Sequence, residues 1–259
     1  MRTLLPLFLL VGCHPHASVS HPPAASHEHG HGHGEHCHRE HGHGEHAEHG
    51  HGHRAHEMPH RFEDAEAWAK RFDDPSRDAW QKPDAVIANL ALPPGATVAD
   101  VGAGTGYFAV RLARAVPQGK VFASDIEPDM VRYLGERAGR ESLTNLVAVQ
   151  GQPEGPALPQ AVDVVLMVDV LHHIGHGDEA EATRVRYFET LAASLARGGR
   201  VVIVDFKPDA PEDGPGPPKR HRLAAAAVVE LLGRAGYELR AQDDTTLAYQ
   251  YVLQFVRRP

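Results

Sequence analysis

The sequence predicts an α/β fold: a Rossmann-like, doubly wound, mostly parallel sheet of seven strands with helices on both faces. From Thr97 onward, short runs of β-branched and apolar residues alternate with segments whose apolar residues recur every three or four positions. Residues 162–170 form a nearly continuous apolar run, typical of a strand buried on both faces of a parallel sheet. A turn with three glycines joins the first strand to the next helix, as in the first half of a nucleotide-binding βαβ unit.

Composition divides the chain into three parts. Of 259 residues, 42% are hydrophobic, which is enough for a core, and the net charge of −8 without a long basic stripe argues against a nucleic-acid binder. Of 21 histidines, 17 precede Arg61, as do both cysteines, so the folded part has neither a disulfide framework nor a cysteine-based zinc site. We predict a signal peptide at 1–12, a His-rich arm at 13–60 and a folded domain at 61–259.

The first twelve residues are typical of a lipoprotein export signal. Arg2 precedes an apolar stretch at residues 4–11 that is too short to span a bilayer as a helix. The end of this stretch, Leu10-Val11-Gly12-Cys13, resembles the lipobox of bacterial lipoproteins, where cleavage leaves the cysteine as a lipidated first residue. The resemblance implies a protein anchored through Cys13 to a membrane of the bacterial cell envelope without spanning it. The alternative is an ordinary apolar N-terminus on a cytoplasmic protein.

Residues 13–60 repeat a His- and Gly-rich pattern with a period near ten and contain almost no apolar side chains. Such a segment cannot bury enough surface to offset its chain entropy, so we predict a disordered arm. Neutral imidazoles with intervening Glu suit Zn²⁺, Ni²⁺ or Cu²⁺, and Cys37 could add a thiolate. The alternative is a solvated tether that binds metal only adventitiously. The candidate metal ligands are the repeat histidines His31, His33, His36, His38, His41, His43, His46, His49, His51 and His53.

Hydrophobic periodicity predicts the elements of the folded part. Aromatic residues at helical intervals predict a helix over residues 62–72, and a proline start predicts another over 83–92. A Pro- and Gly-rich stretch predicts a loop over 207–219, and the last two strands are expected to form a hairpin. The predicted strands are 97–101, 120–126, 146–150, 162–170, 200–206, 237–242 and 250–256, and the helices after the first strand are 108–116, 130–138, 179–196 and 223–234.

An acid opens the glycine turn, in the order Asp100-Val101-Gly102-Ala103-Gly104-Thr105-Gly106-Tyr107. Glycine is needed where φ is positive or where a ligand lies against the backbone. The dinucleotide fingerprint G-x-G-x-x-G would place its third glycine at position 107, where this chain has a tyrosine. The spacing found here resembles motif I of the class I S-adenosylmethionine-dependent methyltransferases. A variant dinucleotide site and a Gly-rich turn without a ligand remain alternatives.

Two further strand ends carry polar candidates. Asp125 follows the second strand, beside Ile126, and a carboxylate there can accept both hydroxyls of a ribose. The same acid would fit NAD, or would cap a helix. After the third strand, Gln152 and Glu154 stand where many methyltransferases have an Asp that reaches the adenine amino group. This departure from the family pattern leaves the adenine contact open.

The fourth strand ends in Asp169-Val170-Leu171-His172-His173, which resembles motif IV of methyltransferases of the ubiquinone/menaquinone-biosynthesis type. The resemblance implies S-adenosylmethionine as cofactor and a small-molecule methyl acceptor. His172 and His173 are candidate bases, because neutral imidazole is competent near pH 7, and the alternative is that they pack against the sheet and cap a loop. The cofactor-binding residues that the resemblance implies are Asp100, Gly102, Gly104, Gly106, Asp125, Ile126, Gln152, Glu154 and Asp169.

The sequence thus predicts methyl transfer from S-adenosylmethionine to an unidentified, small-molecule acceptor. An alternative is a membrane-tethered, His-rich metal-binding protein with an inactive methyltransferase fold; Tyr107 disfavours a dinucleotide oxidoreductase. Arsenite is disfavoured as acceptor, because the folded part has no cysteine. S-adenosylmethionine is made in the cytosol, so export would separate the domain from its cofactor. The acceptor, the side of the membrane and the oligomeric state do not follow from the sequence.

Overall fold

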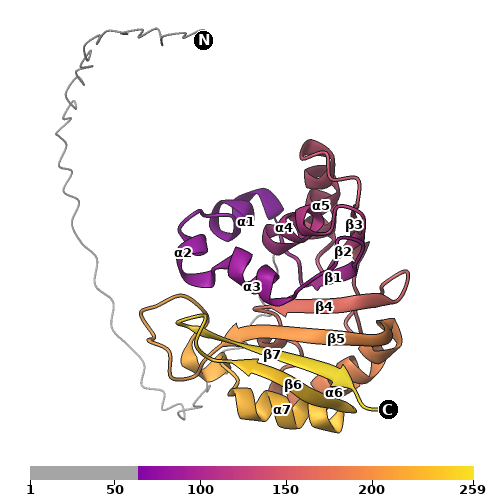
Figure 1. Cartoon of the computed structure of the whole chain (residues 1–259). Coiled ribbons are helices and arrows are strands. Elements are labelled where there is room, and N and C mark those ends of the chain that lie inside the picture. Colours follow the sequence, from indigo (N-terminus) through magenta and orange to yellow (C-terminus); the bar gives the residue numbers. More distant parts are fainter. Residues whose placement is uncertain (1–63) are drawn as a thin grey trace, which may run out of the picture. The chain divides into compact units, whose positions relative to one another are not determined.

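A seven-stranded sheet in the order β3-β2-β1-β4-β5-β7-β6 forms the centre of the domain (Figure 1). The structure is a computed structural model that describes residues 64–259, so Cys13 and the His-rich arm lie outside the described residues. Strand β7 pairs antiparallel with both of its neighbours, and the other neighbouring pairs are parallel. The strands are β1 (Thr97–Val101), β2 (Lys120–Asp125), β3 (Leu146–Gln150), β4 (Val162–Val168), β5 (Leu195–Phe206), β6 (Tyr237–Asp243) and β7 (Gln250–Arg257).

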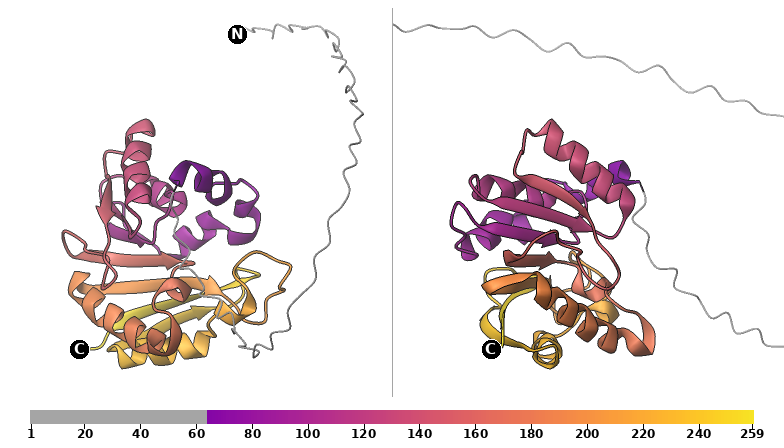
Figure 2. Two further views of the ribbon diagram at one scale, coloured as in Figure 1. Left: turned by 180° about the vertical axis from the view of Figure 1, so that it is seen from behind. Right: turned by 90° about the vertical axis from the view of Figure 1, so that its right-hand side faces the viewer.

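Helices cover both faces of this sheet (Figure 2). Helices α3, α4 and α5 pack on one face through residues such as Val86, Leu112 and Leu134, whereas α6 and α7 pack on the other through Phe188 and Leu231. No helix within residues 64–259 has the length and apolar character needed to cross a membrane. The helices are α1 (Ala65–Phe72), α2 (Arg77–Gln81), α3 (Pro83–Asn89), α4 (Tyr107–Ala115), α5 (Pro128–Arg140), α6 (Ala180–Leu191) and α7 (Ala225–Arg234).

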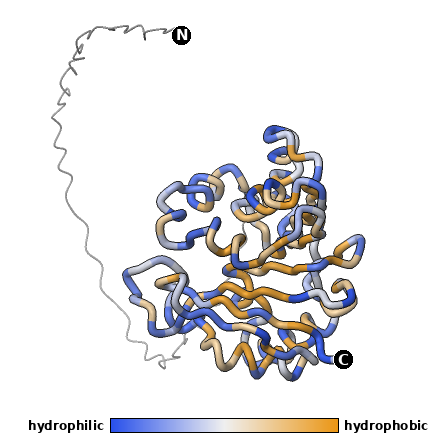
Figure 3. Tube along the Cα trace, in the orientation of Figure 1, coloured by the Kyte–Doolittle hydropathy of each residue, from blue (hydrophilic) through white to orange (hydrophobic). Residues whose placement is uncertain are grey.

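Successive side chains of the central strands divide the core into two layers. Val164 and Leu166 of β4 join the cluster on the α4 face, while Val165 between them joins the cluster on the α6 face. The apolar colouring of the central strands in Figure 3 follows from this double burial. A strand buried on both faces has no polar side to alternate with. The predicted fold class, with its mostly parallel sheet of seven strands and its C-terminal hairpin, is therefore confirmed.

The predicted boundary between helix α6 and strand β5 is wrong. The helix expected over 179–196 ends at Leu191, a short 3-10 turn follows, and β5 begins at Leu195 instead of residue 200. Gly198 and Gly199, which follow the predicted helix, lie inside the strand, and Gly198 has a φ of 79°. The register of β4 with β5 shifts there, from Val162 opposite Leu195 to Val164 opposite Arg200. Glycine marks both helix ends and strand irregularities, so pattern alone could not separate them.

Smaller differences affect other ends. Strands β2 and β4 end one and two residues before the predicted limits, which places Ile126 and Asp169 in the loops that follow. Helix α5 starts at Pro128, because a proline fits the first helical position. The five-residue helix α2 was not predicted. All of these differences lie at the edge of the sheet that carries the candidate site.

Candidate active site

The carboxyl ends of the parallel strands bring the predicted residues to one edge of the sheet (Figure 1). Strand β1 lies between β2 and β4, with Val101 opposite both Ser124 and Met167. The glycine turn after β1, Asp125 at the end of β2 and Asp169 after β4 are consequently neighbours. Open α/β sheets bind ligands at this edge, where strand order changes direction.

The glycine turn requires glycine at each of its three positions. Gly102, Gly104 and Gly106 have φ values of 70°, 54° and 95°, which side chains other than glycine rarely adopt. A Cβ on Gly102 would collide with the side chain of Val170, and one on Gly106 would lie 2.9 Å from Leu134. Gly106 is also the N-cap of α4, so the turn ends where a helix presents its free N–H groups.

Asp100 is a buried acid in β1, two residues before the first glycine of this turn. Burial, followed by the charge of Asp125, raises its pKa to about 7, although the amide of Ala109 and the charge of Arg77 act in the opposite direction. Its Oδ2 and the hydroxyl of Thr105 are buried, with no hydrogen-bond partner among the described residues. Two polar atoms beside the turn therefore retain the capacity to bind a ligand or water.

Asp125 fixes the turn from the neighbouring strand. Gly104 donates its backbone N–H to Oδ2 at 2.8 Å, and Glu127 donates to Oδ1 at 3.0 Å. Burial raises the pKa of Asp125, and these two amides oppose the rise. Each carboxylate oxygen has two acceptor sites, so these bonds leave capacity for a ribose hydroxyl on either oxygen. Asp125 is not the N-cap of α5, which is Glu127, and its bond to the Glu127 N–H is compatible with a ligand role.

Beside Asp125 the surface is apolar and open. The Ile126 side chain is 53% exposed, although large aliphatic residues in this domain are mostly buried. Gln150 holds the backbone of this loop by donating from Nε2 to the carbonyl of Ile126 at 2.8 Å. Gln152 and Glu154, the candidates for an adenine contact, are exposed in the loop that follows β3. The structure places them near the end of β2, because Gly151 donates to the carbonyl of Asp125 at 2.8 Å.

Asp169 collects side-chain donors from distant parts of the chain. Gln81 of α2 donates to Oδ2 at 2.9 Å, Gln250 of β7 donates to Oδ1, and the Arg77 guanidinium lies 3.5 Å from Oδ2. Its backbone is left-handed, with a φ of 61°. Burial raises its pKa to about 6, the charge of Arg77 opposes this, and the charge of Asp205 adds to it. The sequence analysis assigned no site role to Gln81 or Gln250.

The structure separates the two candidate bases. His172 is buried, and its Nδ1 lies 2.9 Å and 3.2 Å from the two carboxylate oxygens of Asp205. Burial alone would lower the pKa of His172, but the hydrogen bond and charge of Asp205 outweigh it, and the pKa is raised. His173 is exposed and lies against the first ring, with centroids 4.2 Å apart. His172 is therefore held in an ion pair with a buried acid.

Helices α1 and α2 cover the glycine turn. A Cβ on Gly104 would lie 3.5 Å from the ring of Phe72, the last residue of α1. Arg77 of α2 donates to the carbonyl of Phe72 at 2.9 Å and lies 4.2 Å above the ring of Tyr107. Arg137 of α5 donates both to Asp73 and to the carbonyl of Thr105, so it ties the segment after α1 to the turn. Residues of α1, α2 and α5 therefore pack around the glycine turn.

An aromatic cluster extends this edge beyond Asp169. The ring of Trp80, on α2, lies 5.9 Å from Phe206 at the end of β5 and 6.4 Å from Tyr249 before β7. Trp80 and Tyr249 are partly exposed. The rings adjoin the polar cluster in sequence, since they precede Gln81, follow Asp205 and precede Gln250. Phe206 itself is buried, so a partly buried aromatic cluster lies beside the polar cluster.

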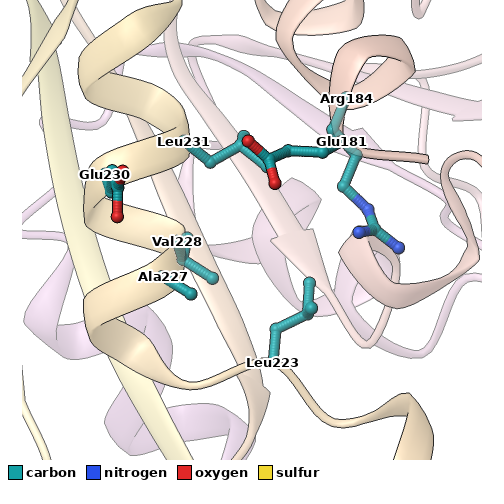
Figure 4. A pocket seen from close by; sticks show the side chains of 7 residues that line it. All are labelled: Glu181, Arg184, Leu223, Ala227, Val228, Glu230 and Leu231. Atoms are coloured by element: carbon teal, nitrogen blue, oxygen red, sulfur yellow. The ribbon is translucent and has the colours of Figure 1, made fainter. Parts of the chain in front are cut away.

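Figure 4 shows a separate pocket of about 120 Å³ between α6 and α7. Its lining includes Arg184, Glu181 and Glu230 together with apolar residues such as Leu223 and Val228. None of the predicted site residues lines it. Within residues 64–259, no group of three or more His, Cys, Asp or Glu side chains is arranged to hold a metal ion. The histidines proposed as metal ligands lie outside the described residues.

Known proteins share this domain. Residues 99–201 match the family described as "Methyltransferase domain". A protein-L-isoaspartate O-methyltransferase of Aeropyrum pernix is 31% identical over 151 residues, 56% of this chain and 54% of the relative. The ubiquinone/menaquinone biosynthesis C-methyltransferase UbiE of Ralstonia nicotianae is 34% identical over 125 residues, 46% of this chain and 47% of the relative. The chain thus spans about half the length of these two curated relatives.

A solved structure extends the similarity to the whole fold. A SAM-dependent methyltransferase from Aquifex aeolicus has a TM-score of 0.65 and 26% identity, covering 73% of this chain and 96% of that chain. Residues 99–201 therefore match a methyltransferase domain model, and the fold around them is similar to that of S-adenosylmethionine-dependent methyltransferases. The predicted resemblance to this class is confirmed.

The residues on the sheet edge fit S-adenosylmethionine. The buried, unbonded Asp100 Oδ2 and Thr105 Oγ1 offer polar contacts beside the glycine turn. Asp125 retains acceptor capacity for a ribose, and the exposed Ile126 offers an apolar face for an adenine ring. When bound, the cofactor supplies an electrophilic methyl group. The chain's own residues must then orient the acceptor, exclude water and, where the acceptor carries a proton, remove it.

Proposed function

We propose that the protein transfers a methyl group from S-adenosylmethionine to a small-molecule acceptor. The observation that carries this proposal is the bond from Gly104 N–H to Asp125 Oδ2, which joins the glycine turn of β1 to the acid of β2. The turn leads into the start of α4, where a helix presents its free N–H groups, and the acid retains acceptor capacity for hydroxyl groups. Gly104 is one of the three positive-φ glycines of the turn, and Asp125 is followed by the exposed Ile126.

Calorimetry with S-adenosylmethionine, S-adenosylhomocysteine and NAD tests the cofactor. We expect the two sulfur nucleosides to bind and NAD not to bind. The substitution Asp125→Ala should weaken S-adenosylmethionine binding by about 1.5–3 kcal/mol, as expected for hydrogen bonds to a charged group. Asp163→Ala is the matched control: Asp163 accepts the backbone N–H of Thr97 at 2.8 Å, at the start of β1 instead of its end.

The control should lose some stability without losing cofactor affinity. NAD binding as tight as that of S-adenosylmethionine would refute the proposal, and an unchanged affinity in Asp125→Ala would leave that acid only its bonds to the amides of Gly104 and Glu127. A complete failure to bind the sulfur nucleosides would favour the alternative, a tethered metal-binding protein with an inactive methyltransferase fold.

The acceptor is proposed to be a small molecule with a nucleophilic oxygen, nitrogen or carbon. Similar proteins include ubiquinone/menaquinone C-methyltransferases at 31% and 34% identity. A structure of an O-methyltransferase with this fold, 20% identical, is in complex with 1,4-dihydroxy-2-naphthoic acid. The aromatic cluster of Trp80, Phe206 and Tyr249 supports an acceptor with a flat ring. Dihydroxynaphthoic acid is therefore a suitable first trial acceptor.

The N-terminal proposals rest on sequence alone. Lipidation of Cys13 would anchor the protein to a membrane, and the histidines of residues 13–60 would bind Zn²⁺, Ni²⁺ or Cu²⁺. Cell fractionation with lipid labelling, on the full chain and on Cys13→Ser, tests the anchor. Release of the variant from membranes is the expected result, whereas an unprocessed Met1 with unlabelled Cys13 would exclude it. Protease protection in the same fractions locates the domain relative to the membrane.

A further inference from the structure

The pair formed by His172 and Asp205 arises from two adjacent strands. His172 follows β4 in a short 3-10 turn, and Asp205 is the penultimate residue of β5. These strands are parallel neighbours with Val168 opposite Val204, so the residues that follow both positions meet at the active edge (Figure 1). Asp205 is 0% exposed and His172 is 9% exposed. A buried acid and a nearly buried imidazole are thus in contact at the carboxyl ends of β4 and β5.

The pair determines where the imidazole proton resides. A carboxylate only accepts hydrogen bonds, so Nδ1 of His172, at 2.9 Å and 3.2 Å from the two oxygens, carries the hydrogen. Phe206 donates its backbone N–H to Oδ1 of Asp205 at 2.8 Å and so fixes the carboxylate. In the neutral imidazole the lone pair is then on Nε2. Asp205 therefore selects one of two tautomers.

Charged groups on three elements act on His172. Asp205 of β5 and Asp169 after β4 favour the protonated ring, whereas burial and Arg184 of α6 disfavour it; the net effect raises the pKa. The ring of His173, in the same turn, lies tilted against that of His172, with 4.2 Å between centroids. The neutral form of His172 is consequently a stronger base than an exposed imidazole.

His172 lies close to the glycine turn and to Asp169. Val170, two residues earlier, packs so closely on Gly102 that a Cβ there would collide with it. Asp169, whose charge acts on His172, accepts hydrogen bonds from Gln81 and Gln250. A proton-accepting group at this place therefore adjoins the glycine turn and the polar cluster around Asp169.

We infer that His172 removes the acceptor's proton through Nε2 and that Asp205 is a positioning residue that holds the competent tautomer. This inference rests on the proposed function and narrows it to acceptors with an ionisable O–H, N–H or activated C–H. The acceptor atom forms a bond to the methyl carbon, and the carbon–sulfur bond breaks with its electron pair remaining on sulfur. The acceptor proton passes to Nε2, the resulting imidazolium is paired with Asp205, and solvent finally takes the proton.

The first test needs no acceptor. Full-length protein with ¹⁵N-labelled histidine is titrated by long-range ¹H–¹⁵N NMR, and the signals absent from His172→Gln identify His172. We expect the Nδ1–H tautomer in the wild type and a pKa above about 6.5, the unperturbed value for histidine. In Asp205→Asn the pKa should fall by about one unit or more, because the favourable charge is removed while the shape is kept. Asp209→Asn, an exposed acid in the nearby loop, is the matched control.

The second test uses S-adenosylmethionine with dihydroxynaphthoic acid. His172→Gln should lower kcat by about 10²–10⁴-fold, the usual range for a general base. Asp205→Asn should lower kcat less and should shift the acidic limb of the kcat–pH profile downward by the same amount as the pKa in the NMR titration. S-adenosylmethionine affinity, measured by calorimetry, should change less than about two-fold in both variants.

The outcomes separate the two proposals. An Nε2–H tautomer in the wild type, or a His172 pKa unmoved by Asp205→Asn, overturns the role of Asp205, even where cofactor binding is intact. A fall in kcat without a shift of the acidic limb also overturns it, since a merely structural residue would behave in this way. Absence of S-adenosylmethionine binding refutes the proposed function instead. Should Asp205→Asn fail to fold, the wild-type tautomer and pKa still decide the inference.

Discussion

The two sides of the active edge are built in different ways. The cofactor side, defined by Asp100, the three glycines, Asp125 and Ile126, comes from one continuous stretch and is held mainly by backbone amides. The acceptor side, defined by Gln81, Asp169, His172, Asp205 and Gln250, is held by side chains from remote positions. Gln81 and Gln250, for example, are 169 residues apart and lie 3.3 Å from each other between Nε2 and Oε1.

This difference has a physical consequence for variation. A site made of backbone amides depends on φ values, so it tolerates few residue types at its turns. A site made of side chains can exchange one donor for another while the strands stay in place. The cofactor side should therefore be sensitive to any added Cβ, and the acceptor side should be the place where substrate preference is set.

Gly102→Ala is expected to have the largest effect of the substitutions that probe this contrast. Alanine at a φ of 70° costs about 1–2 kcal/mol, and the collision with Val170 adds about 1–3 kcal/mol of overpacking. Denaturant unfolding should show a loss of about 2–5 kcal/mol, and cofactor binding should be lost with it.

Gly135→Ala makes the same chemical change on α5, where a Cβ meets nothing within 4 Å. Alanine is the better helix former, so this control should gain about 1 kcal/mol in the free energy of unfolding. Equal effects of the two substitutions would show that the turn does not depend on its positive φ values, and the contrast between the two sides would lose its basis.

The same contrast explains what the sequence could reveal. The glycine turn, Asp125 and the apolar run of β4 are local patterns, because φ values and strand burial act on neighbouring residues. The fold class followed from these patterns with the correct strand count. Helix α2 did not, because five residues are too few for a helical period to be visible.

The donors around Asp169 were not predictable from local pattern. Gln81 and Gln250 are ordinary polar residues whose role arises only when α2 and β7 reach the end of β4. Asp205 offered a weak signal, since it closes an apolar strand and the adjacent strand leads into His172. Pairing the acids and histidines at the ends of neighbouring strands would have suggested this contact before the structure was known.

Ile126→Ala gives the smallest expected effect and isolates the cofactor side from stability. Ile126 and Val147 are the two large hydrophobic residues exposed within residues 64–259, at 53% and 37%. Truncating either should change the free energy of unfolding by less than about 0.5 kcal/mol, because little buried surface is lost. If Ile126 covers the adenine ring, its truncation should weaken S-adenosylmethionine binding by about 1 kcal/mol, roughly five-fold.

Val147→Ala, on β3, should leave that affinity unchanged, and calorimetry with thermal melting measures both quantities on each variant. Equal affinities in the two variants would remove Ile126 from the site and leave its exposure without a role. A loss confined to Ile126→Ala would place the adenine at the end of β2. Gln152 and Glu154, in the loop that Gly151 joins to Asp125, would then be the next residues to substitute, because they lie on the same part of the edge.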